Sequence, residues 1–481
     1  MFIAGLDIGT TGSKCSVYDH NGQPIKEVYQ EYSVSITKEA HTVNVNLIWN
    51  CVLSILNEIS SEIKHIDAIC VTSFGEASVL LDESDNPLTD AYLFTDPNGE
   101  AQCQSLVDAF GEDFIFDTTG LVPGKMYSVA KWLWIKHSNP QAWAKCKKIA
   151  LIEDYIVYKL SGVHQIDYSL ATRTMAFDIQ NLSWNKKILE FAEISESLLP
   201  NIVPIGTIAD RLLDSVNIGF TNRPLIVSGC HDQVAAAIGT GVLKEKTAVD
   251  GTGTVECLTA VFKSGVNTKI LQKCGYAIVP YIDNLYITYA FTYTGGALLK
   301  WYRNQFAPSE DYAKFNLSVD NEHPSGLLIL PHFAGSGTPY PDSLAKGAIL
   351  GLTLDSTKEQ IYQALMEGPT YEMKLNLNKF AQAGADINTI YATGGGASSK
   401  EWLQIKADIM EKEIITLKSS QSGTLGCIML AGVACGIYKD LHEAAKKLVL
   451  IKDVYNPNPD RVKEYQCLYK EYEQLYPKLY L

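Results

Sequence analysis

The segment that decides the fold is Phe2-Ile-Ala-Gly-Leu-Asp7-Ile-Gly-Thr-Thr-Gly-Ser-Lys14-Cys-Ser-Val-Tyr-Asp19. Two apolar stretches flank a Gly/Thr turn, and this pattern is typical of a β-hairpin. Half a chain later, residues 248–261 repeat the plan, with Asp250 directly before the turn Gly251-Thr-Gly-Thr254. The two hairpins therefore predict a duplicated domain.

Elsewhere the sequence alternates apolar strands with helices. Residues 225–229 predict a buried strand that leads into a helix of small residues at 233–240. Residues 387–393 likewise lead through Gly394-Gly-Gly396 to helical spacing at 401–410. Strand, turn and helix in this order are typical of α/β proteins. We therefore predict an α/β fold, with residues 66–72 as a further buried strand.

Local signals predict one domain boundary and one long helix. The charged connector at residues 243–248 predicts a boundary that separates domain 1–243 from domain 244–481. In the second domain, Ser356 is predicted to cap a helix that begins at residue 357. Gly368-Pro369 is predicted to end or kink that helix, although helical spacing continues to about residue 380.

Composition excludes several classes of function. Lys and Arg number 40 and Asp and Glu 54, so the formal net charge is −14, which argues against binding to nucleic acid or anionic lipid. No apolar run reaches the roughly 18 residues of a membrane span, and no signal peptide precedes the first strand. The 11 cysteines form no CxxC pair, so no zinc site or disulfide framework is predicted. These features predict a cytoplasmic protein; the oligomeric state stays open, with a homodimer among the alternatives.

The first Gly/Thr turn carries the chemistry of an anion site. Gly9, Thr10, Thr11 and Gly12 expose successive backbone amides, which form a nest for phosphate oxygens. Asp7 ends the preceding strand, where a carboxylate can bind Mg²⁺ beside phosphates. An ordinary hairpin with a solvated Asp is the alternative. The second turn repeats this chemistry, and the pair favours nucleotide binding.

Asp232 follows the predicted strand at 225–229, in the motif Gly229-Cys-His-Asp-Gln233. Ligands of α/β sheets bind at such strand ends. An Asp there can accept a hydroxyl proton during phosphoryl transfer, although a helix cap is the alternative role. His231 is interpreted as a structural or contact residue rather than the base.

In this order the motifs resemble the FGGY family of carbohydrate kinases, within the actin-like ATPase superfamily. The resemblance covers residues 2–436. The motifs that carry it are GLDIGTTGSK (5–14), MYSVAKWLWI (126–135), GCHDQ (229–233), DGTGT (250–254), GSGTPYPDSLAKGAILGL (335–352), QIYQALMEG (360–368) and GGGASSKEWLQIKAD (394–408).

The resemblance implies two actin-like, ribonuclease H-like domains with an ATP cleft between them, the sugar site in domain 1–243 and the adenosine site in domain 244–481. It implies transfer of the γ-phosphate of ATP, with Mg²⁺, to a hydroxyl group. By resemblance, Asp232 matches the catalytic base and Asp7 the residue near the metal. The cofactor-binding positions that it implies are Thr10, Thr11 and Lys14 for the first phosphate loop, Gly251, Thr252, Gly253 and Thr254 for the second, and Gly395, Gly396 and Ser398 for adenosine.

The substrate loop of the family aligns with Ser73-Phe-Gly-Glu76-Ala-Ser. Xylulokinase-like members carry Met-His-Gly there, whereas glycerol-kinase-like members carry a Glu preceded by Arg. Here Gly75 precedes Glu76, and Phe94-Thr-Asp96 resembles the Trp-Asn-Asp of xylulokinases. Gly75, Glu76, Asp96 and Asp232 are therefore the predicted substrate residues, because paired carboxylates suit the hydroxyls of a polyol. The loop contains no cation, which disfavours an acidic sugar.

The function predicted on these grounds is an ATP-dependent kinase for a neutral ketose or polyol, most similar to xylulokinases. Kinases for gluconate, glycerol or ribulose are the alternatives within the family. An actin-like ATPase without a sugar substrate and a catalytically silent sugar sensor are alternatives of other classes. A silent sensor would be expected to have lost Asp7 or Asp232, and both are present.

Overall fold

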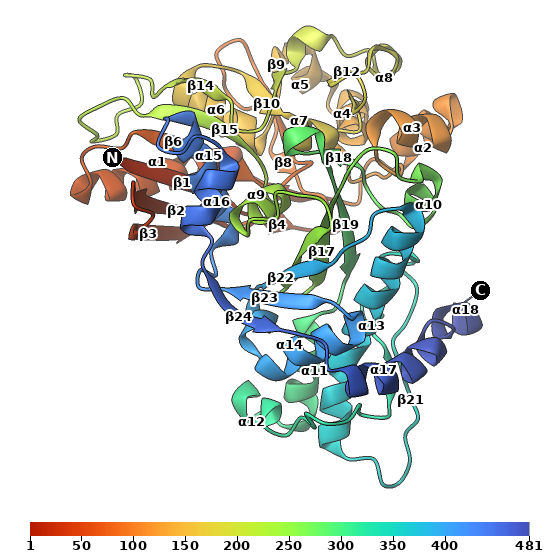
Figure 1. Ribbon diagram of the computed structural model, residues 1–481. Helices are drawn as coiled ribbons and strands as arrows, with labels where there is room; N and C mark the ends of the chain where they lie inside the picture. The colour runs from red at the N-terminus through yellow and green to blue at the C-terminus, as the bar shows by residue number, and fades with distance from the viewer. Residues whose placement is uncertain (481) are drawn as a thin grey trace. The chain divides into compact units, whose positions relative to one another are not determined.

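A computed structural model describes residues 1–480, and it divides into two compact units (Figure 1). Unit 1 comprises Met1–Leu243, Ile278–Asn284 and Gln421–Val449. Unit 2 comprises Lys244–Ala277, Leu285–Ser420 and Leu450–Leu481. The first passage from unit 1 to unit 2 falls in the charged connector at residues 243–248, and unit 1 then receives two later segments of the chain.

Unit 1 is built on a six-stranded sheet in the order β14-β15-β6-β1-β2-β3. Its strands are β1 (Phe2–Ile8), β2 (Gly12–Asp19), β3 (Pro24–Glu31), β6 (Ala68–Ser73), β14 (Ile208–Arg211) and β15 (Leu225–His231). Strands β1 and β2 pair antiparallel, which confirms the first predicted hairpin. Strands β1, β6 and β15 are parallel, and this brings the carboxyl ends of β1 and β15 to the same edge of the sheet.

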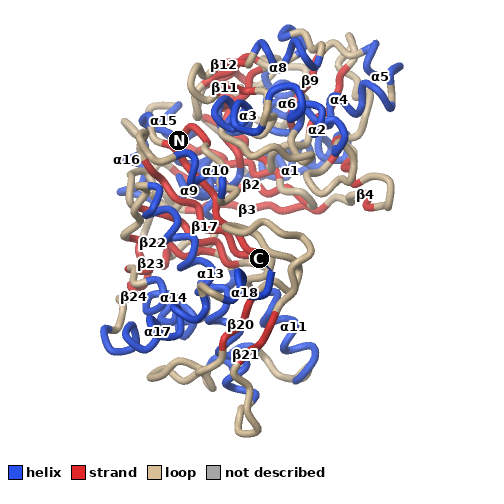
Figure 2. Tube along the Cα trace, turned by 90° about the vertical axis from the view of Figure 1, so that its right-hand side faces the viewer, coloured by secondary structure: helices blue, strands red, loops and turns tan. Residues whose placement is uncertain are grey.

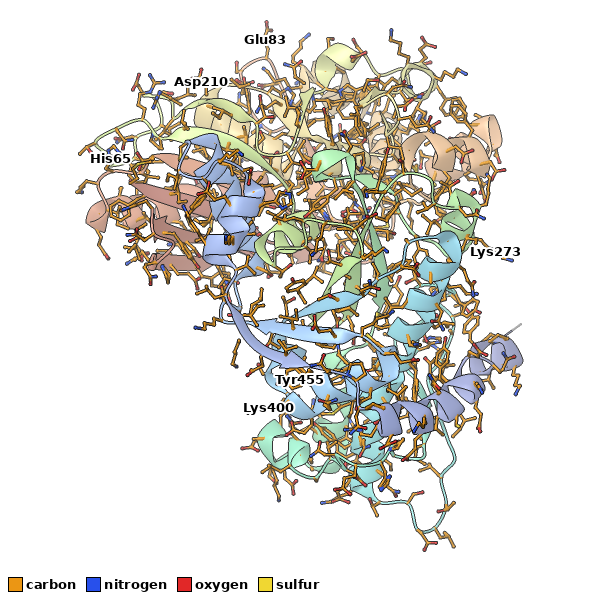
Figure 3. The ribbon with its side chains drawn as sticks, in the orientation of Figure 1. His65, Glu83, Asp210, Lys273, Lys400 and Tyr455 are labelled. Carbon is orange, nitrogen blue, oxygen red and sulfur yellow. The ribbon has the colours of Figure 1, made fainter. Side chains whose placement is uncertain are left out.

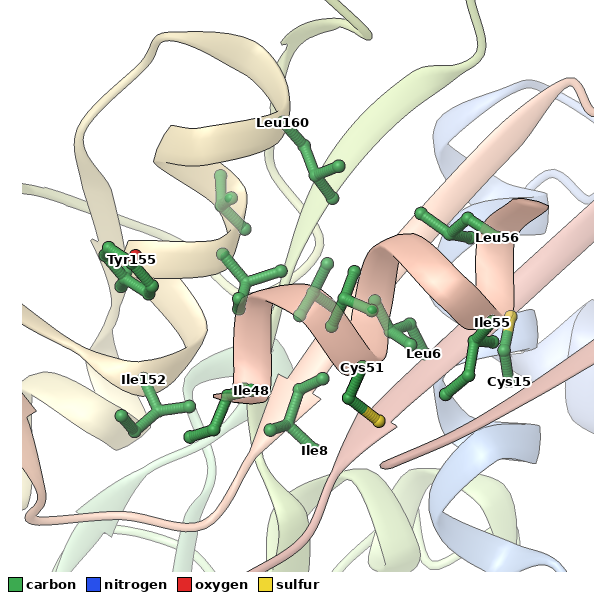
Figure 4. Packing of buried hydrophobic residues seen from close by; sticks show 14 of the residues in the cluster. Leu6, Ile8, Cys15, Ile48, Cys51, Ile55, Leu56, Ile152, Tyr155 and Leu160 are labelled. Atoms are coloured by element: carbon green, nitrogen blue, oxygen red, sulfur yellow. The ribbon is translucent and has the colours of Figure 1, made fainter. Parts of the chain in front are cut away.

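Helices cover both faces of this sheet. On one face, Leu6 and Ile8 of β1 pack with α1 (Val45–Glu62) and α6 (Ile152–Ser161) in one apolar core, shown in Figure 4. On the other face lies α15 (Ser422–Ala434), which packs on β1 and against α9 (Asp232–Gly239). Because side chains alternate along a strand, Gly5 and Asp7 face α15. A Cβ on Gly5 would lie 2.5 Å from the Thr424 carbonyl oxygen, so only glycine permits this close approach.

Unit 2 repeats the strand plan of unit 1. Within a seven-stranded sheet, its own strands run β19-β17-β16-β22-β23-β24, with antiparallel pairs β19-β17 and β17-β16, parallel pairs β16-β22 and β22-β23, and an antiparallel edge strand β24. The bounds are β16 (Thr247–Thr252), β17 (Glu256–Phe262), β19 (Tyr286–Thr292), β22 (Thr389–Thr393), β23 (Glu413–Leu417) and β24 (Ile451–Tyr455). The β16-β17 hairpin confirms the second predicted hairpin. The matching order of both sheets agrees with a duplicated domain, in which β16 corresponds to β1.

Two helices of unit 2 matter for the site. Helix α13 (Lys358–Ala383) is continuous through Pro369, and Thr357 is its N-cap, forming a capping box with Gln360. The predicted cap at Ser356 is therefore wrong by one residue, because Gln360 can return a hydrogen bond to Thr357 only across a three-residue spacing. Helix α14 (Lys400–Met410) packs on α13 and on β23 (Figure 2).

The remaining elements support these cores. In unit 1 they are β4 (Ser35–Ile36), β5 (His41–Val43), β7 (Ser78–Leu81), β8 (Ala91–Tyr92), β9 (Lys148–Leu151), β10 (Gln165–Asp167), β11 (Phe177–Asp178), β12 (Ser183–Trp184), β13 (Asn201–Val203), α2 (Glu100–Phe110), α3 (Glu112–Thr119), α4 (Ser128–Ser138), α5 (Pro140–Lys145), α7 (Tyr168–Thr172), α8 (Lys186–Ala192) and α16 (Leu441–Leu448). In unit 2 they are β20 (Leu328–Leu330), β21 (Ala348–Leu350), α10 (Thr268–Lys273), α11 (Gly296–Phe306), α12 (Tyr312–Asn316), α17 (Pro459–Tyr472) and α18 (Leu475–Tyr480). Across residues 1–480, no helix has the length and apolar character needed to cross a bilayer.

Candidate active site

The first Gly/Thr turn joins β1 to β2 and is closed by a hydrogen bond from the Gly9 amide to the Gly12 carbonyl oxygen at 2.9 Å. Thr11 is exposed at its tip and Thr10 is half-buried. The Tyr32 hydroxyl donates to the Gly9 carbonyl oxygen and fixes the turn from the side. Lys14, at the start of β2, donates from Nζ to Oε1 of Gln421 at 2.6 Å, so the first turn is also tied to the entry of α15.

Asp7 is the residue of this turn that fits a divalent cation. Burial raises the pKa of its carboxyl to about 6, and the nearby charge of Lys14 opposes that rise. Within residues 1–480, its carboxylate accepts no hydrogen bond and forms no ion pair. A half-buried carboxylate without a partner gains most from a hard cation such as Mg²⁺, whose preferred ligands are oxygens.

Asp232 begins α9 directly after β15. Its Oδ1 accepts the Gln233 amide at 2.6 Å and lies 3.2 Å from Nε2 of His231. The side chain keeps 34% of its surface exposed, and no donor within residues 1–480 bonds its Oδ2. Oδ2 is therefore the oxygen that can accept a proton from a bound hydroxyl.

The electrostatic surroundings tune Asp232. Burial, which has the largest effect, and the negative charges of Asp7 and Glu76 raise its pKa to about 7, although the Gln233 amide and Arg173 oppose that rise. Burial, together with Arg173, lowers the pKa of His231 well below its usual value, so the imidazole is neutral. A carboxyl that titrates near neutral pH is suited to general base catalysis, and this agrees with the interpretation of His231 as a contact residue.

Glu76 lies in the same unit and is held by a residue that the sequence did not reveal. Arg173, just after α7, donates from Nε to Oε1 of Glu76 at 2.6 Å and donates to the same oxygen from Nη2. The guanidinium also lies 5.1 Å from the ring centre of Tyr127. Glu76 has a left-handed backbone with φ of 64°, which side-chain residues seldom adopt without support. Its Oε2 accepts no hydrogen bond from residues 1–480 and stays available to a ligand.

The structure corrects two premises about the substrate loop. The loop carries no cation of its own, but Arg173 supplies one across 97 residues of sequence. Gly75 makes room for it, since a Cβ there would lie 3.0 Å from Cγ of Arg173 and 3.1 Å from Cδ2 of His231. Gly75 thus makes space for Arg173 and His231, and its predicted contact with the substrate stays a prediction.

Asp96 is already bonded within the protein, so its predicted contact with the sugar stays a prediction that the structure does not support directly. Its carboxylate accepts Nζ of Lys131 at 2.8 Å, the amide of His41 at 2.8 Å and the amide of Asn98 at 3.0 Å. The side chain is 0% exposed. Its oxygens are fully occupied and shielded, so the pairing of Glu76 with Asp96 as hydroxyl binders is not supported.

In unit 2 the second turn and the glycine turn pack together. The second turn is closed by the Gly253 amide and the Val255 carbonyl oxygen at 2.9 Å, and it exposes Gly253 and Thr254. Gly395 and Ser398 bound a short 3₁₀ turn before α14, and both are exposed. A Cβ on Gly396 would lie 2.6 Å from Cβ of Thr252, so the turns can touch only because this position is glycine. Thr252 is buried, and its hydroxyl is bonded to Lys406.

Comparison with known proteins identifies the family. The models for the N-terminal and C-terminal domains of the FGGY family of carbohydrate kinases match residues 2–239 and 252–435. The chain belongs to the FGGY family of carbohydrate kinases. It is therefore a sugar phosphotransferase of a family that uses ATP.

Several members of the family resemble the whole chain. A xylulose kinase of Bacillus subtilis (strain 168) is 26% identical over 484 residues, covering 99% of this chain and 96% of the relative. A glycerol kinase of Janthinobacterium sp. (strain Marseille) is 30% identical over 463 residues, covering 92% of each. The structure of a ligand-bound xylulose kinase from Lactobacillus acidophilus has a TM-score of 0.90 at 24% identity, covering 99% of this chain and 98% of that one. The predicted α/β fold and family are confirmed.

Arg173 is the functional residue that sequence reasoning missed. A signal was present, because it is the only charged residue in the run 168–177. An isolated charge within an otherwise uncharged, largely apolar run is seldom buried without a partner. The run therefore indicates a partner, although it does not say which one.

Proposed function

We propose that this kinase transfers the γ-phosphate of ATP to a hydroxyl of a neutral ketose or polyol, with a xylulose-like ketose as the first candidate. The observation that carries the proposal is the arrangement around Asp232. A carboxyl with a pKa of about 7 shares its electrostatic environment with the Glu76–Arg173 pair and with Asp7. A proton acceptor, a hydroxyl-binding group and a metal-binding carboxylate thus belong to one unit.

In the proposed reaction, Oδ2 of Asp232 accepts the proton of the attacking hydroxyl. The hydroxyl oxygen forms a bond to the γ-phosphorus, the bond from that phosphorus to the oxygen of the ADP leaving group breaks, and ADP departs. Neutral His231, 3.2 Å from Oδ1, holds the carboxylate without adding charge. Positioning and charge neutralisation, rather than covalent chemistry, supply most of the rate in such transfers.

The nucleotide is assigned to the Gly/Thr turns and the glycine turn. The turns at Thr10 and Thr11, and at Gly253 and Thr254, reach the surface, where backbone amides of such turns suit phosphate oxygens. The exposed backbone of Gly395, together with Gly396 and Ser398, suits the adenosine. Asp7 would hold Mg²⁺, which when bound neutralises charge on the phosphates. Lys14 adds a positive charge beside Asp7.

A neutral acceptor is favoured by the charge balance at Glu76. The guanidinium of Arg173 is paired with the Glu76 carboxylate, so the pair presents no net charge to the substrate. The available Oε2 of Glu76 can accept a hydroxyl hydrogen bond. A sugar acid would face two carboxylates, Glu76 and Asp232, with one cation already paired. The names of the relatives, xylulose kinase and glycerol kinase, agree with a neutral substrate.

The test is a coupled assay of ADP release over pentuloses, hexuloses, polyols and aldonates. We expect the highest kcat/KM for a ketose or polyol. Asp232→Ala should lower kcat by about a hundredfold or more while the affinity for nucleotide stays nearly constant. Asp210→Ala is the matched control, because Asp210 lies exposed on β14 of the same unit (Figure 3). A variant that keeps kcat within a few-fold of the parent would show that Asp232 is not the base.

The assignment of Glu76 has its own test. Glu76→Gln should raise KM for the sugar by about tenfold to a hundredfold, since losing a charged hydrogen bond costs about 1.5–3 kcal/mol. KM for ATP should stay constant. Glu83→Gln removes the same charge from an exposed position shortly after β7 and serves as the control (Figure 3). An aldonate as best acceptor would refute the neutral substrate, and an unchanged sugar KM would refute the role of Glu76.

A further inference from the structure

The second Gly/Thr turn sits above a buried group of charges that the proposed reaction does not use. Asp250, at the end of β16, and Glu256, at the start of β17, are both 0% exposed. Lys406 reaches them from α14 and is 1% exposed. One ammonium therefore faces two carboxylates inside unit 2, and Figure 1 shows α14 beside the sheet that carries the turn.

The ammonium of Lys406 uses all three of its hydrogen-bond donors within this group. Nζ donates to Oε1 of Glu256 at 2.8 Å, to Oγ1 of Thr252 at 2.6 Å and to Oδ2 of Asp250. A lysine has three donors and no more. The three acceptors lie before, within and after the turn, so Lys406 ties both ends of the turn and its buried threonine to one point.

A comparison of the two hairpins indicates a role for the ammonium of Lys406. Asp7 and Asp250 occupy corresponding places, one residue before the end of β1 and two residues before the end of β16. The carboxylate of Asp7 has no partner within residues 1–480, whereas that of Asp250 is bound to Lys406. In the first hairpin Lys14 lies near Asp7 but bonds to Gln421, whereas in the second hairpin Lys406 is bonded to Asp250 itself.

We propose that Lys406 is the built-in cation of the second hairpin, a positioning residue that holds the turn Gly251–Thr254 in the shape that binds nucleotide phosphate. This inference rests on the proposed function. The second hairpin then needs no metal ion, and Mg²⁺ belongs to Asp7 alone. Lys406 acts through Thr252 and the two carboxylates and does not touch phosphate, since all its donors are occupied.

Loss of this ammonium would change the second turn directly and the adjacent adenosine turn through it. Two buried carboxylates without a cation repel each other, and burial already raises the pKa of Glu256, with Lys406 opposing the rise. The strands that carry them meet at the turn, so the exposed amides of the turn would move. Gly394 and Gly396 pack directly on Thr252, at 2.6 Å for a Cβ placed on either, so the adenosine turn would move with it.

The test is Lys406→Met, which keeps an unbranched side chain of nearly the same length and removes its charge. We expect KM for ATP, and the calorimetric Kd for ADP measured without acceptor, to rise about tenfold or more. KM for the acceptor sugar should change by less than about twofold, because the acceptor residues belong to unit 1. Lys374→Met is the control, because it removes an ion pair with Glu411 at 2.8 Å elsewhere in unit 2.

A folded Lys406→Met protein with unchanged ADP affinity would overturn the inference, and so would an equal rise of both KM values. If this variant does not fold, Thr252→Val is the test, because it removes one hydrogen-bond acceptor of Lys406 and keeps every charge. A rise of about threefold or more in the Kd for ADP supports the inference, and an unchanged Kd overturns it. A parent protein that binds no ADP would refute the proposed function itself, a result distinct from either outcome.

Discussion

The pH dependence of kcat/KM is the sharpest consequence of the site. The proposed base must be ionised to accept a proton, and the pKa of Asp232 is raised to about 7. With that pKa, about one tenth of the enzyme carries an ionised base at about pH 6 and about nine tenths at about pH 8. We therefore expect kcat/KM to fall about tenfold between these values as the pH is lowered.

The same reasoning predicts the direction in which a substitution moves this profile. The negative charge of Glu76 raises the pKa of Asp232, and Arg173 lowers it. Glu76→Gln removes the negative charge of Glu76 and leaves the positive charge of Arg173 without its partner, so both effects lower the pKa of Asp232. The acidic limb of the profile should therefore move to lower pH, even though the sugar binds more weakly.

The assay is the coupled ADP-release reaction with ATP saturating and the sugar well below KM, so that kcat/KM reports the enzyme before the sugar binds. Thermal stability at each pH, measured in parallel, separates unfolding from titration. An acidic limb at the ordinary pKa of an aspartate would refute the electrostatic account of Asp232. A limb that moves to higher pH in Glu76→Gln would refute the proximity of the two carboxyls.

Three further outcomes follow from the contacts. Thr11→Val and Thr254→Val should each weaken ATP binding by about 1.5–3 kcal/mol in calorimetry and leave sugar binding intact. Unchanged ATP affinity in both variants would refute the proposal that the two turns bind phosphate. Arg173→Met should leave Glu76 buried without its cation and raise the sugar KM more than Glu76→Gln does, and an equal or smaller rise would contradict the pairing. Gly426→Ala should lower the free energy of unfolding by about 1–3 kcal/mol, because its methyl would collide with the Ala235 carbonyl oxygen of α9; an unchanged melting temperature would contradict this packing.

Local sequence patterns predicted those elements of the fold that depend on residues close to one another in sequence. Both hairpins, the strands at β6, β15 and β22, and the helices that follow β15 and the glycine turn depend on apolar patterning and turn residues close in sequence. The one-residue error at Thr357 has the same origin, since Ser356 and Thr357 are both good caps and only the reciprocal bond to Gln360 separates them.

Other features depend on contacts that no local pattern records. Residues 421–449 follow most of unit 2 in sequence but pack into unit 1, where α15 faces Asp7 and α9. Small residues permit that packing, as at Gly5 and Gly239, yet small residues occur in many turns and helices. The sequence therefore predicted the glycines of the turns correctly and gave no reason to assign those of α15 to the core of unit 1.

Arg173 and Lys406 show why a candidate site read from motifs is incomplete. Each motif supplied a carboxylate at a turn, Glu76 in one case and Asp250 in the other, and each carboxylate is compensated by a cation 97 or 156 residues away. A buried ionised carboxylate that lacks a cation costs on the order of several kcal/mol, and in these two cases the fold brings a cation from far along the chain. Asp7 forms no ion pair within residues 1–480, although the charge of Lys14 lies near it. Among these turn carboxylates Asp7 is the one without a bonded cation, and this is why we propose it, rather than Glu76 or Asp250, as the residue that would hold Mg²⁺.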